Sequence, residues 1–181
     1  MDIFTAIETR RSNGLVTDEP VSKEQIEALL EMAAWAPNHK RTEPWAFHVF
    51  ADDARQKLAD AIAAENDAET GQKAFRAPVV IAVVATPGRA EKNPPVWEDH
   101  AATAAALQNM ALAAHGLGLA GFWKSGKFCE QKAVKDLLKV DDSKEDRIMG
   151  FFYVGHPDKT RPQPLRARPH WAEKTTWHSM K

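Results

Sequence analysis

The chain has 181 residues, with 24 Lys and Arg against 25 Asp and Glu. This length fits one domain with its own core, and the balanced charge argues against nucleic acid or an anionic membrane as a partner. The single cysteine, Cys129, excludes an intrachain disulfide and a zinc site built from cysteines. The N-terminus lacks the apolar core of a signal peptide, and no apolar run reaches about 18 residues, so we expect a soluble, cytoplasmic protein.

The chain begins with apolar residues at helical spacing, Ile3, Phe4 and Ile7. The predicted helix runs into the cluster Arg10, Arg11 and Ser12, and Asn13-Gly14 ends it. Guanidinium groups bind phosphate oxygens bidentately and a serine hydroxyl adds a hydrogen bond, so this cluster is a candidate anion site. Paired arginines at a helix end are also common on a solvated face, where they favour the helix dipole. The cluster alone does not decide between these two readings.

A second helix is predicted after Ser22, because Ser22 and Gln25 have the spacing of a capping box. An apolar stripe follows, and the helix ends before Pro37. The next segment is a polar loop bounded by prolines, which would fix its backbone and could present its side chains to a ligand. The strand formers from Trp45 to Phe50 predict the first strand.

The middle of the chain predicts helices over 52–66 and 69–76, followed by the continuously apolar run 78–84. Such a run is typical of a strand covered on both faces, so we expect it at the centre of the sheet. The segment from about 97 to 115 is rich in alanine and predicts a helix that is apolar nearly all round. Such a helix needs cover from the core or from a partner subunit.

A short strand that opens with Phe122-Trp123, a helix over 129–139 and a last strand over 149–154 complete the predicted elements. From about residue 157 the tail combines prolines and arginines with Trp171 and Trp177. It is too polar for a core and too aromatic for a free linker, so we expect an extended arm laid over another surface, such as a partner subunit. Helices and strands mix without regular alternation, which favours an α+β fold over a doubly wound sheet.

Residues 116–121 match the dinucleotide fingerprint G-x-G-x-x-G letter for letter. That fingerprint works when a strand feeds a glycine turn that opens a helix. Here a helix precedes the glycines and a strand follows, so we interpret the segment as a helix stop and a tight turn. The histidines lack the spacing of a metal site, and nucleophile elbows and Walker loops are absent from the sequence, so we expect no metal and no hydrolase chemistry.

Four segments in chain order resemble the nitroreductase family of FMN enzymes. They are Arg10-Arg11-Ser12, Ala36-Pro37 followed by Pro44-Trp45-Ala46-Phe47, Gly116-Leu117-Gly118 leading to Trp123-Lys124-Ser125-Gly126, and Gly155-His156-Pro157 with Arg166 and Arg168. The resemblance implies an α+β fold with a central mixed, largely antiparallel sheet flanked by helices. It also implies one FMN-binding domain over 1–181 and an intertwined homodimer with FMN at the subunit interface.

The resemblance further implies which residues contact the cofactor. Arg10 and Ser12 would hold the FMN phosphate or ribityl chain, with Arg11 beside them and Arg168 closing the phosphate site. Trp35 and His39 would reach the flavin from the partner subunit. Backbone N–H groups of the turn Trp123-Lys124-Ser125 would face the flavin edge near N5 and O4.

The chain also departs from the family pattern. Arg41-Thr42-Glu43 stands where many relatives have Asn-x-Gln, and Lys73 only loosely matches a lysine of larger relatives. Flavin contacts by Arg41, Glu43 and Lys73 therefore stay open.

The activity that the resemblance implies is electron transfer from NAD(P)H to a small-molecule acceptor, nitroaromatic or related, by a ping-pong mechanism. The chemistry would lie at flavin N5, with no catalytic side chain. The alternatives are a flavin-dependent reductase of quinones, enones or free flavin, and a non-catalytic FMN-binding protein. The sequence decides neither the physiological acceptor nor the choice between NADH and NADPH.

Overall fold

The computed structural model describes residues 1–91, 93–161, 167 and 169–179. Its centre is a four-stranded sheet in the order β1-β2-β4-β3. The strands are β1 (Trp45–Ala51), β2 (Val79–Ala85), β3 (Ala120–Lys124) and β4 (Arg147–Gly155). Neighbouring strands pair antiparallel, and one isolated parallel bridge joins Ser12 to Gly121 beside β3. The expected α+β fold with a mixed, largely antiparallel sheet is confirmed.

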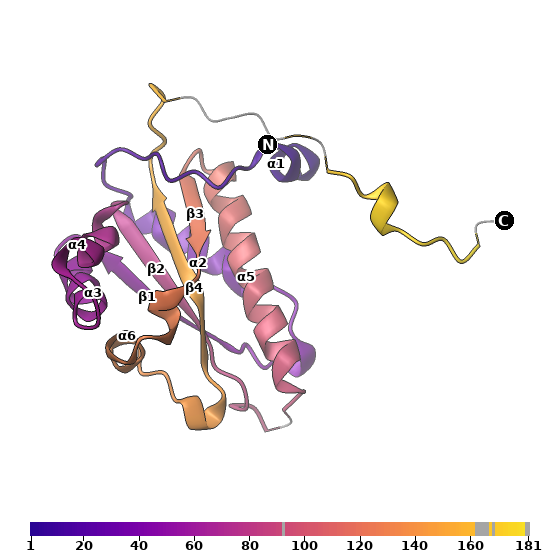
Figure 1. The fold of residues 1–181 in the computed structure, drawn as a ribbon. Helices are drawn as coiled ribbons and strands as arrows, with labels where there is room; N and C mark the ends of the chain where they lie inside the picture. Colours follow the sequence, from indigo (N-terminus) through magenta and orange to yellow (C-terminus); the bar gives the residue numbers. More distant parts are fainter. Residues whose placement is uncertain (92, 162–166, 168, 180–181) are drawn as a thin grey trace.

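Helices cover both faces of this sheet (Figure 1). On one face lie α2 (Lys23–Ala34) and the long α5 (Val96–Gly116), which pack on each other. The other face carries α3 (Ala54–Ala63), α4 (Ala68–Gly71) and α6 (Lys132–Leu137). The first helix, α1 (Ile3–Thr9), lies outside these layers at the C-terminal end of α5. None of the helices in the described part of the chain is long and apolar enough to cross a membrane.

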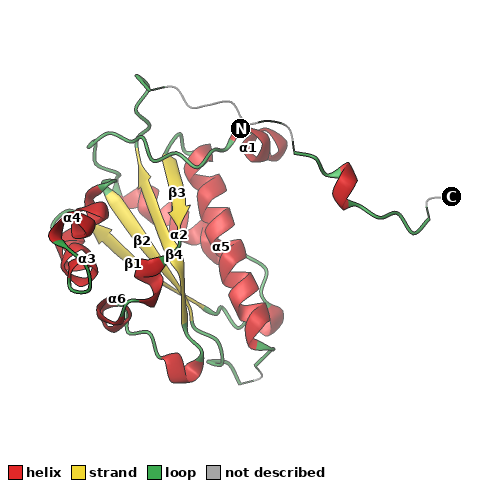
Figure 2. Cartoon of the chain, in the orientation of Figure 1, coloured by secondary structure: helices red, strands yellow, loops and turns green. Residues whose placement is uncertain are grey.

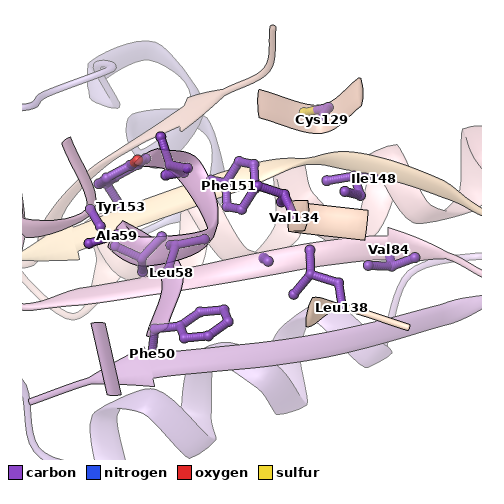
Figure 3. Close-up of a cluster of buried hydrophobic side chains, with 14 of the residues drawn as sticks. Phe50, Leu58, Ala59, Val84, Cys129, Val134, Leu138, Ile148, Phe151 and Tyr153 are labelled. Atoms are coloured by element: carbon purple, nitrogen blue, oxygen red, sulfur yellow. The ribbon is translucent and has the colours of Figure 1, made fainter. Parts of the chain in front are cut away.

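The central strand β2 has every residue buried, as its continuously apolar sequence predicts. Because side chains alternate across a strand, Val80, Ala82 and Val84 face one hydrophobic cluster and Val79, Ile81 and Val83 face the other. Figure 3 shows the first cluster, in which Phe151 and Tyr153 of β4 pack with Leu58 of α3 and with Val134 and Leu138 around α6. The second cluster packs β2 and β4 against α2 and α5.

The glycine run after α5 is a helix stop, as its place in the sequence predicts. Gly118 has φ +75, and its N–H donates to the carbonyl of His115, while the N–H of Leu119 donates to the carbonyl of Ala114. This pair of bonds is a Schellman motif, which closes a helix on a glycine in the left-handed region. The chain then enters β3, so the order of elements is opposite to that of a dinucleotide-binding turn.

Several predicted bounds differ from the structure. The helix predicted over 69–76 is the four-residue α4 followed by a 3-10 turn, Gln72–Phe75. The helix predicted over 129–139 is a 3-10 turn, Lys127–Glu130, followed by the six-residue α6. The strand β3 begins before the predicted start at Phe122, since Ala120 and Gly121 belong to it. A Cβ atom at Gly121 would lie 2.6 Å from the Phe152 ring, so this strand position admits only glycine.

Residues 169–179 lie apart from the sheet and helices in Figure 1. Within these described residues the one regular element is a 3-10 turn, Ala172–Lys174, and Trp171 and Trp177 are exposed.

Candidate functional site

The cluster Arg10, Arg11 and Ser12 lies between α1 and the start of β3. Asp2 caps the first turn of α1 and Arg10 ends the helix. Arg11 donates from Nη1 to the backbone carbonyls of Glu8 and Arg10, at 2.7 and 2.9 Å. Ser12 then bridges to Gly121. The cluster is therefore held by backbone contacts along an edge strand.

Arg10 and Arg11 line a hollow of about 310 Å³ between α1, the end of α5 and the start of β3. The lining also includes Asn13, His115 and the segment 118–121. Partial burial lowers the pKa of His115, and the charges of Arg10 and Arg11 lower it further. The imidazole is accordingly neutral at pH 7, and the two guanidinium groups give the hollow positive charge. This is the electrostatic setting of an anion site.

The turn Trp123-Lys124-Ser125 lies at the opposite end of β3. The indole Nε1 of Trp123 donates to the carbonyl of Met149 at 2.8 Å. The ring lies over Gly150, which has φ +144 and where a Cβ atom would collide with the indole. Trp123 and Ser125 line a second hollow of about 520 Å³ together with His100, Lys127, Arg147 and Met149.

The side chain of Lys124 belongs to a basic cluster with Lys73 and Arg76. The Nζ atoms of Lys124 and Lys73 lie 5.0 and 5.8 Å from the centroid of the same ring, Phe128. Burial lowers the pKa of Lys124, and the charges of Arg76 and Lys73 lower it further. Like charges held this close favour an anionic or electron-rich ligand.

Lys73 was left open by the sequence, and the structure brings it to the end of β3. The signal in the sequence was its loose match to a lysine of larger relatives. A continuous helix was expected there, whereas Lys73 lies on the 3-10 turn that follows α4, where its side chain reaches Phe128.

The loop between α2 and β1 carries His39 and follows Trp35, which ends α2 and is 75% exposed. Three of its residues have positive φ: Lys40, Arg41 and Glu43, at 56°, 56° and 43°. Each costs about 1 kcal/mol or more in a non-glycine residue, so the loop must be held by its surroundings.

The start of α5 holds this loop (Figure 2). Thr42 donates to the Asp99 carboxylate at 2.8 Å, and Thr103 donates to the carbonyl of Pro44 at 2.9 Å. His39 Nδ1 lies 2.6 Å from Glu98 Oε2. His39 and Glu98 also line a third hollow of about 430 Å³ beside α5, together with Pro37, Asn38, Trp97, Ala101, Ala102 and Ala105.

The predicted site residues thus form three groups. Arg10, Arg11 and Ser12 lie at the start of β3, and Trp123, Lys124 and Ser125 lie at its end. Among the described residues, Trp35 lines none of these three hollows and His39 lines the third, away from both ends of β3. Their expected contact with a partner's flavin stays a prediction. Arg168 lies outside the described residues.

Comparison with known proteins decides the family. The model of the nitroreductase family matches residues 7–156. The chain belongs to the nitroreductase family. The family that the resemblance predicted is therefore confirmed. The match covers the sheet and its helices, and it ends where the tail begins.

Individual relatives agree with this family assignment. The nitroreductase-family chain is 33% identical over 168 residues to the Escherichia coli (strain K12) protein named "Putative NAD(P)H nitroreductase YdjA", covering 87% of this chain and 89% of that protein. A nitroreductase-like family protein from Bacillus cereus has a TM-score of 0.83 and 31% identity, covering 98% of this chain and 96% of its own. A "putative nitroreductase in complex with FMN" from Desulfovibrio desulfuricans has a TM-score of 0.78 and 31% identity, covering 100% and 99%.

Proposed function

We propose that this protein is an FMN-dependent oxidoreductase that transfers electrons from NAD(P)H to a nitroaromatic or related acceptor. The observation that carries the proposal is the edge strand β3, which has a pair of arginines at its start and a basic cluster at its end. The relatives support it, since one is named an NAD(P)H nitroreductase and another is a complex with FMN.

The residues around β3 fit FMN. Two guanidinium groups and the Ser12 hydroxyl suit a terminal phosphate, which accepts several charge-assisted hydrogen bonds. Between the two ends of β3, Gly121 carries no side chain, so a ligand lying along the strand would meet only its backbone there. The Schellman turn at Gly118 leaves no dinucleotide fingerprint, which favours FMN over FAD.

The proposal gives each group one task. Arg10, Arg11 and Ser12 bind the phosphate and ribityl chain, and Arg168 would complete that end. The backbone N–H groups of the Trp123-Lys124-Ser125 turn orient the flavin edge near N5 and O4.

At the far end, Lys73, Arg76 and Lys124 supply positive charge toward N1 and O2. When bound, FMN supplies the redox chemistry, in which NAD(P)H gives a hydride and the acceptor takes the electrons.

A homodimer with FMN at its interface is part of the proposal. The three large apolar residues of α1 are exposed, with Ile3, Phe4 and Ile7 at 57%, 76% and 55%, while Ala6 is buried. An apolar helix face of this kind needs a covering surface. A second copy would cover it and would also bring Trp35 and His39 to the partner's flavin.

We also propose a single domain over 1–181 whose arm, from about residue 157, lies on the partner subunit. Trp171 and Trp177 are the side chains that such a contact would bury. The free, buried Cys129 fits a reducing, cytoplasmic setting.

Identifying the released cofactor tests the proposal. Heat denaturation of the purified protein and chromatography of the supernatant should recover FMN. FAD, or no flavin, would contradict the proposal. NADH should then bleach the flavin absorbance of the intact protein under anaerobic conditions, whereas a binding module without turnover would keep its colour.

A further inference from the structure

The hollow beside α5, which we name the Trp97 hollow, is lined by Pro37, Asn38, His39, Trp97, Glu98, Ala101, Ala102 and Ala105. We propose that it binds the electron acceptor: a flat aromatic compound stacked on Trp97, with its polar substituent at the pair His39 and Glu98. This inference rests on the proposed function and names the part of the site that selects the acceptor.

Trp97 provides the stacking surface. It is the second residue of α5, directly after Pro94, Pro95 and Val96, and it is 68% exposed. An indole held at the first turn of a helix has a fixed anchor and an open face. Exposed aromatic surface next to a hollow is typical of a binding site, because the ring gains both burial and stacking when a flat ligand covers it.

The alanines make the rest of the wall flat. Ala101 and Ala105 follow Trp97 by four and eight residues, so all three lie on one face of α5. Methyl groups at these positions leave room that larger side chains would fill. The volume of about 430 Å³ also lies within the range of small-molecule sites.

The pair His39 and Glu98 provides the polar end. The Glu98 carboxylate accepts, so His39 Nδ1 is the donor across the 2.6 Å contact. This fixes the imidazole and leaves Nε2, for which no bond is found among the described residues, as an acceptor for a hydroxyl or amine hydrogen of the ligand.

The walls of the Trp97 hollow are held in one rigid unit. One wall is the strained loop 38–44 and the other is α5, and Thr42–Asp99 and Thr103–Pro44 hydrogen bonds join them. The hollow is thus formed before a ligand enters, which lowers the cost of ordering it.

The Trp97 hollow lies next to the residues proposed to contact the flavin. Pro37 and Asn38, which line it, connect Trp35 to His39, the two residues proposed to reach the partner's flavin. A ligand that touches His39 in this hollow would therefore lie beside that flavin. The tail of the partner subunit is the competing occupant, because Trp171 or Trp177 could fill the same space.

The test uses the FMN-loaded protein and dicoumarol, a flat aromatic inhibitor that is not turned over. Binding is followed by the change in flavin absorbance and by tryptophan fluorescence, and sedimentation and flavin content are measured for each variant. Trp97→Ala should raise the dicoumarol Kd about fivefold to tenfold, while Trp97→Phe keeps most of the affinity, as expected for a stacked ring. Leu117→Ala, which removes a 45% exposed apolar side chain at the other end of α5 and outside the three hollows, is the control and should leave Kd within about twofold.

A second variant closes the hollow instead of enlarging it. Ala101→Leu keeps a strong helix former on α5 but places bulk on the flat wall, so it should weaken dicoumarol binding without loss of flavin. An unchanged Kd in both Trp97→Ala and Ala101→Leu, with flavin bound and reduced by NADH, would overturn the inference and leave the proposed function standing. Dissociation of the dimer by Trp97→Ala would show that the partner subunit fills the hollow, which also overturns it. A wild-type protein without flavin would instead defeat the proposed function.

Discussion

The hydroxyl of Thr42 donates a hydrogen bond of 2.8 Å to Oδ1 of Asp99, a carboxylate that is only 1% exposed. The other oxygen of Asp99 has no hydrogen-bond partner among the described residues. This contact joins the strained loop that bears His39 to the first turn of α5, so one buried bond supports two walls of the Trp97 hollow.

Thr42→Val should destabilise the protein, because it keeps the shape of the side chain and removes the donor to a buried carboxylate. The free energy of unfolding should fall by about 1 to 3 kcal/mol, the range for leaving a buried polar group unpaired. Urea denaturation followed by circular dichroism measures this change. Thr17→Val is the control, since its hydroxyl takes only a 3.4 Å bond from the Glu19 N–H, and an equal loss in both variants would contradict the role of Thr42.

Arg10→Ala should weaken FMN binding by about 1.5 to 3 kcal/mol, the range for a hydrogen bond to a charged group. The backbone of Arg10 ends α1 and is kept in the variant, so the fold should persist. Titration of the apoprotein with FMN, followed by quenching of flavin fluorescence, gives the affinity. Lys57→Ala removes an exposed cation of α3 outside the three hollows and should change nothing, and an unchanged affinity in Arg10→Ala would exclude Arg10 from the phosphate site.

The fold was largely predictable from the sequence because its patterns are local. The capping box of Ser22 and Gln25 forms as predicted and starts α2, and the apolar run of β2 is buried at the sheet centre. Short elements were harder, since a four-residue helix and a 3-10 turn have too few residues for a hydrophobic period to distinguish them. The start of β3 was not predicted, because glycine is untypical of strands. The reason for a glycine at position 121 is the Phe152 ring on the neighbouring strand, which the sequence alone does not show.

The candidate site was predictable only where its residues adjoin in sequence. Arg10 and Ser12 were found as a cluster, and Lys124 as part of a turn. Lys73 and Arg76 reach Lys124 through the packing of a 3-10 turn against Phe128, which no spacing in the sequence encodes. Trp97 and His39 are 58 positions apart and meet because α5 holds the loop before β1.

Lys124→Met should raise the stability of the apoprotein at neutral pH and weaken FMN binding. The folded-state pKa of Lys124 is lowered chiefly by burial, and then by Arg76 and Lys73, so the unfolded chain holds this proton more firmly. The charge of Lys124 therefore lowers the free energy of unfolding. This loss is full below the folded-state pKa and vanishes as pH rises past the ordinary lysine pKa of about 10.4.

Urea midpoints of wild type and Lys124→Met, without FMN, should thus differ at pH 7 and converge toward pH 10.5, near the ordinary lysine pKa. Lys127→Met, at an exposed position in the adjoining 3-10 turn, is the matched control. A gap that stays constant with pH would show that the lysine charge is not the cause.

Phe4→Asp should disrupt the dimer, because Phe4 is 76% exposed on the outward apolar face of α1 and a carboxylate there cannot be buried against a second copy. Sedimentation should show a dimer for wild type at micromolar concentration and a monomer with reduced flavin content for the variant. Val49→Asp, at a partly exposed apolar position of β1, tests for a general effect of an added charge. A wild-type monomer that binds FMN tightly would refute a site shared between subunits.

Steady-state kinetics should follow a ping-pong pattern. NAD(P)H and the acceptor must both reach the same flavin position, and the glycine run that might have held a separate nucleotide is a Schellman turn. One place then serves two substrates in turn, so double-reciprocal plots at several acceptor concentrations should be parallel. Dicoumarol should compete with the nicotinamide in the wild type, and Trp97→Ala should weaken this competition. Intersecting lines, or a complex that holds nicotinamide and acceptor together, would show that the two substrates occupy separate places, and the Trp97 hollow would then serve the acceptor alone.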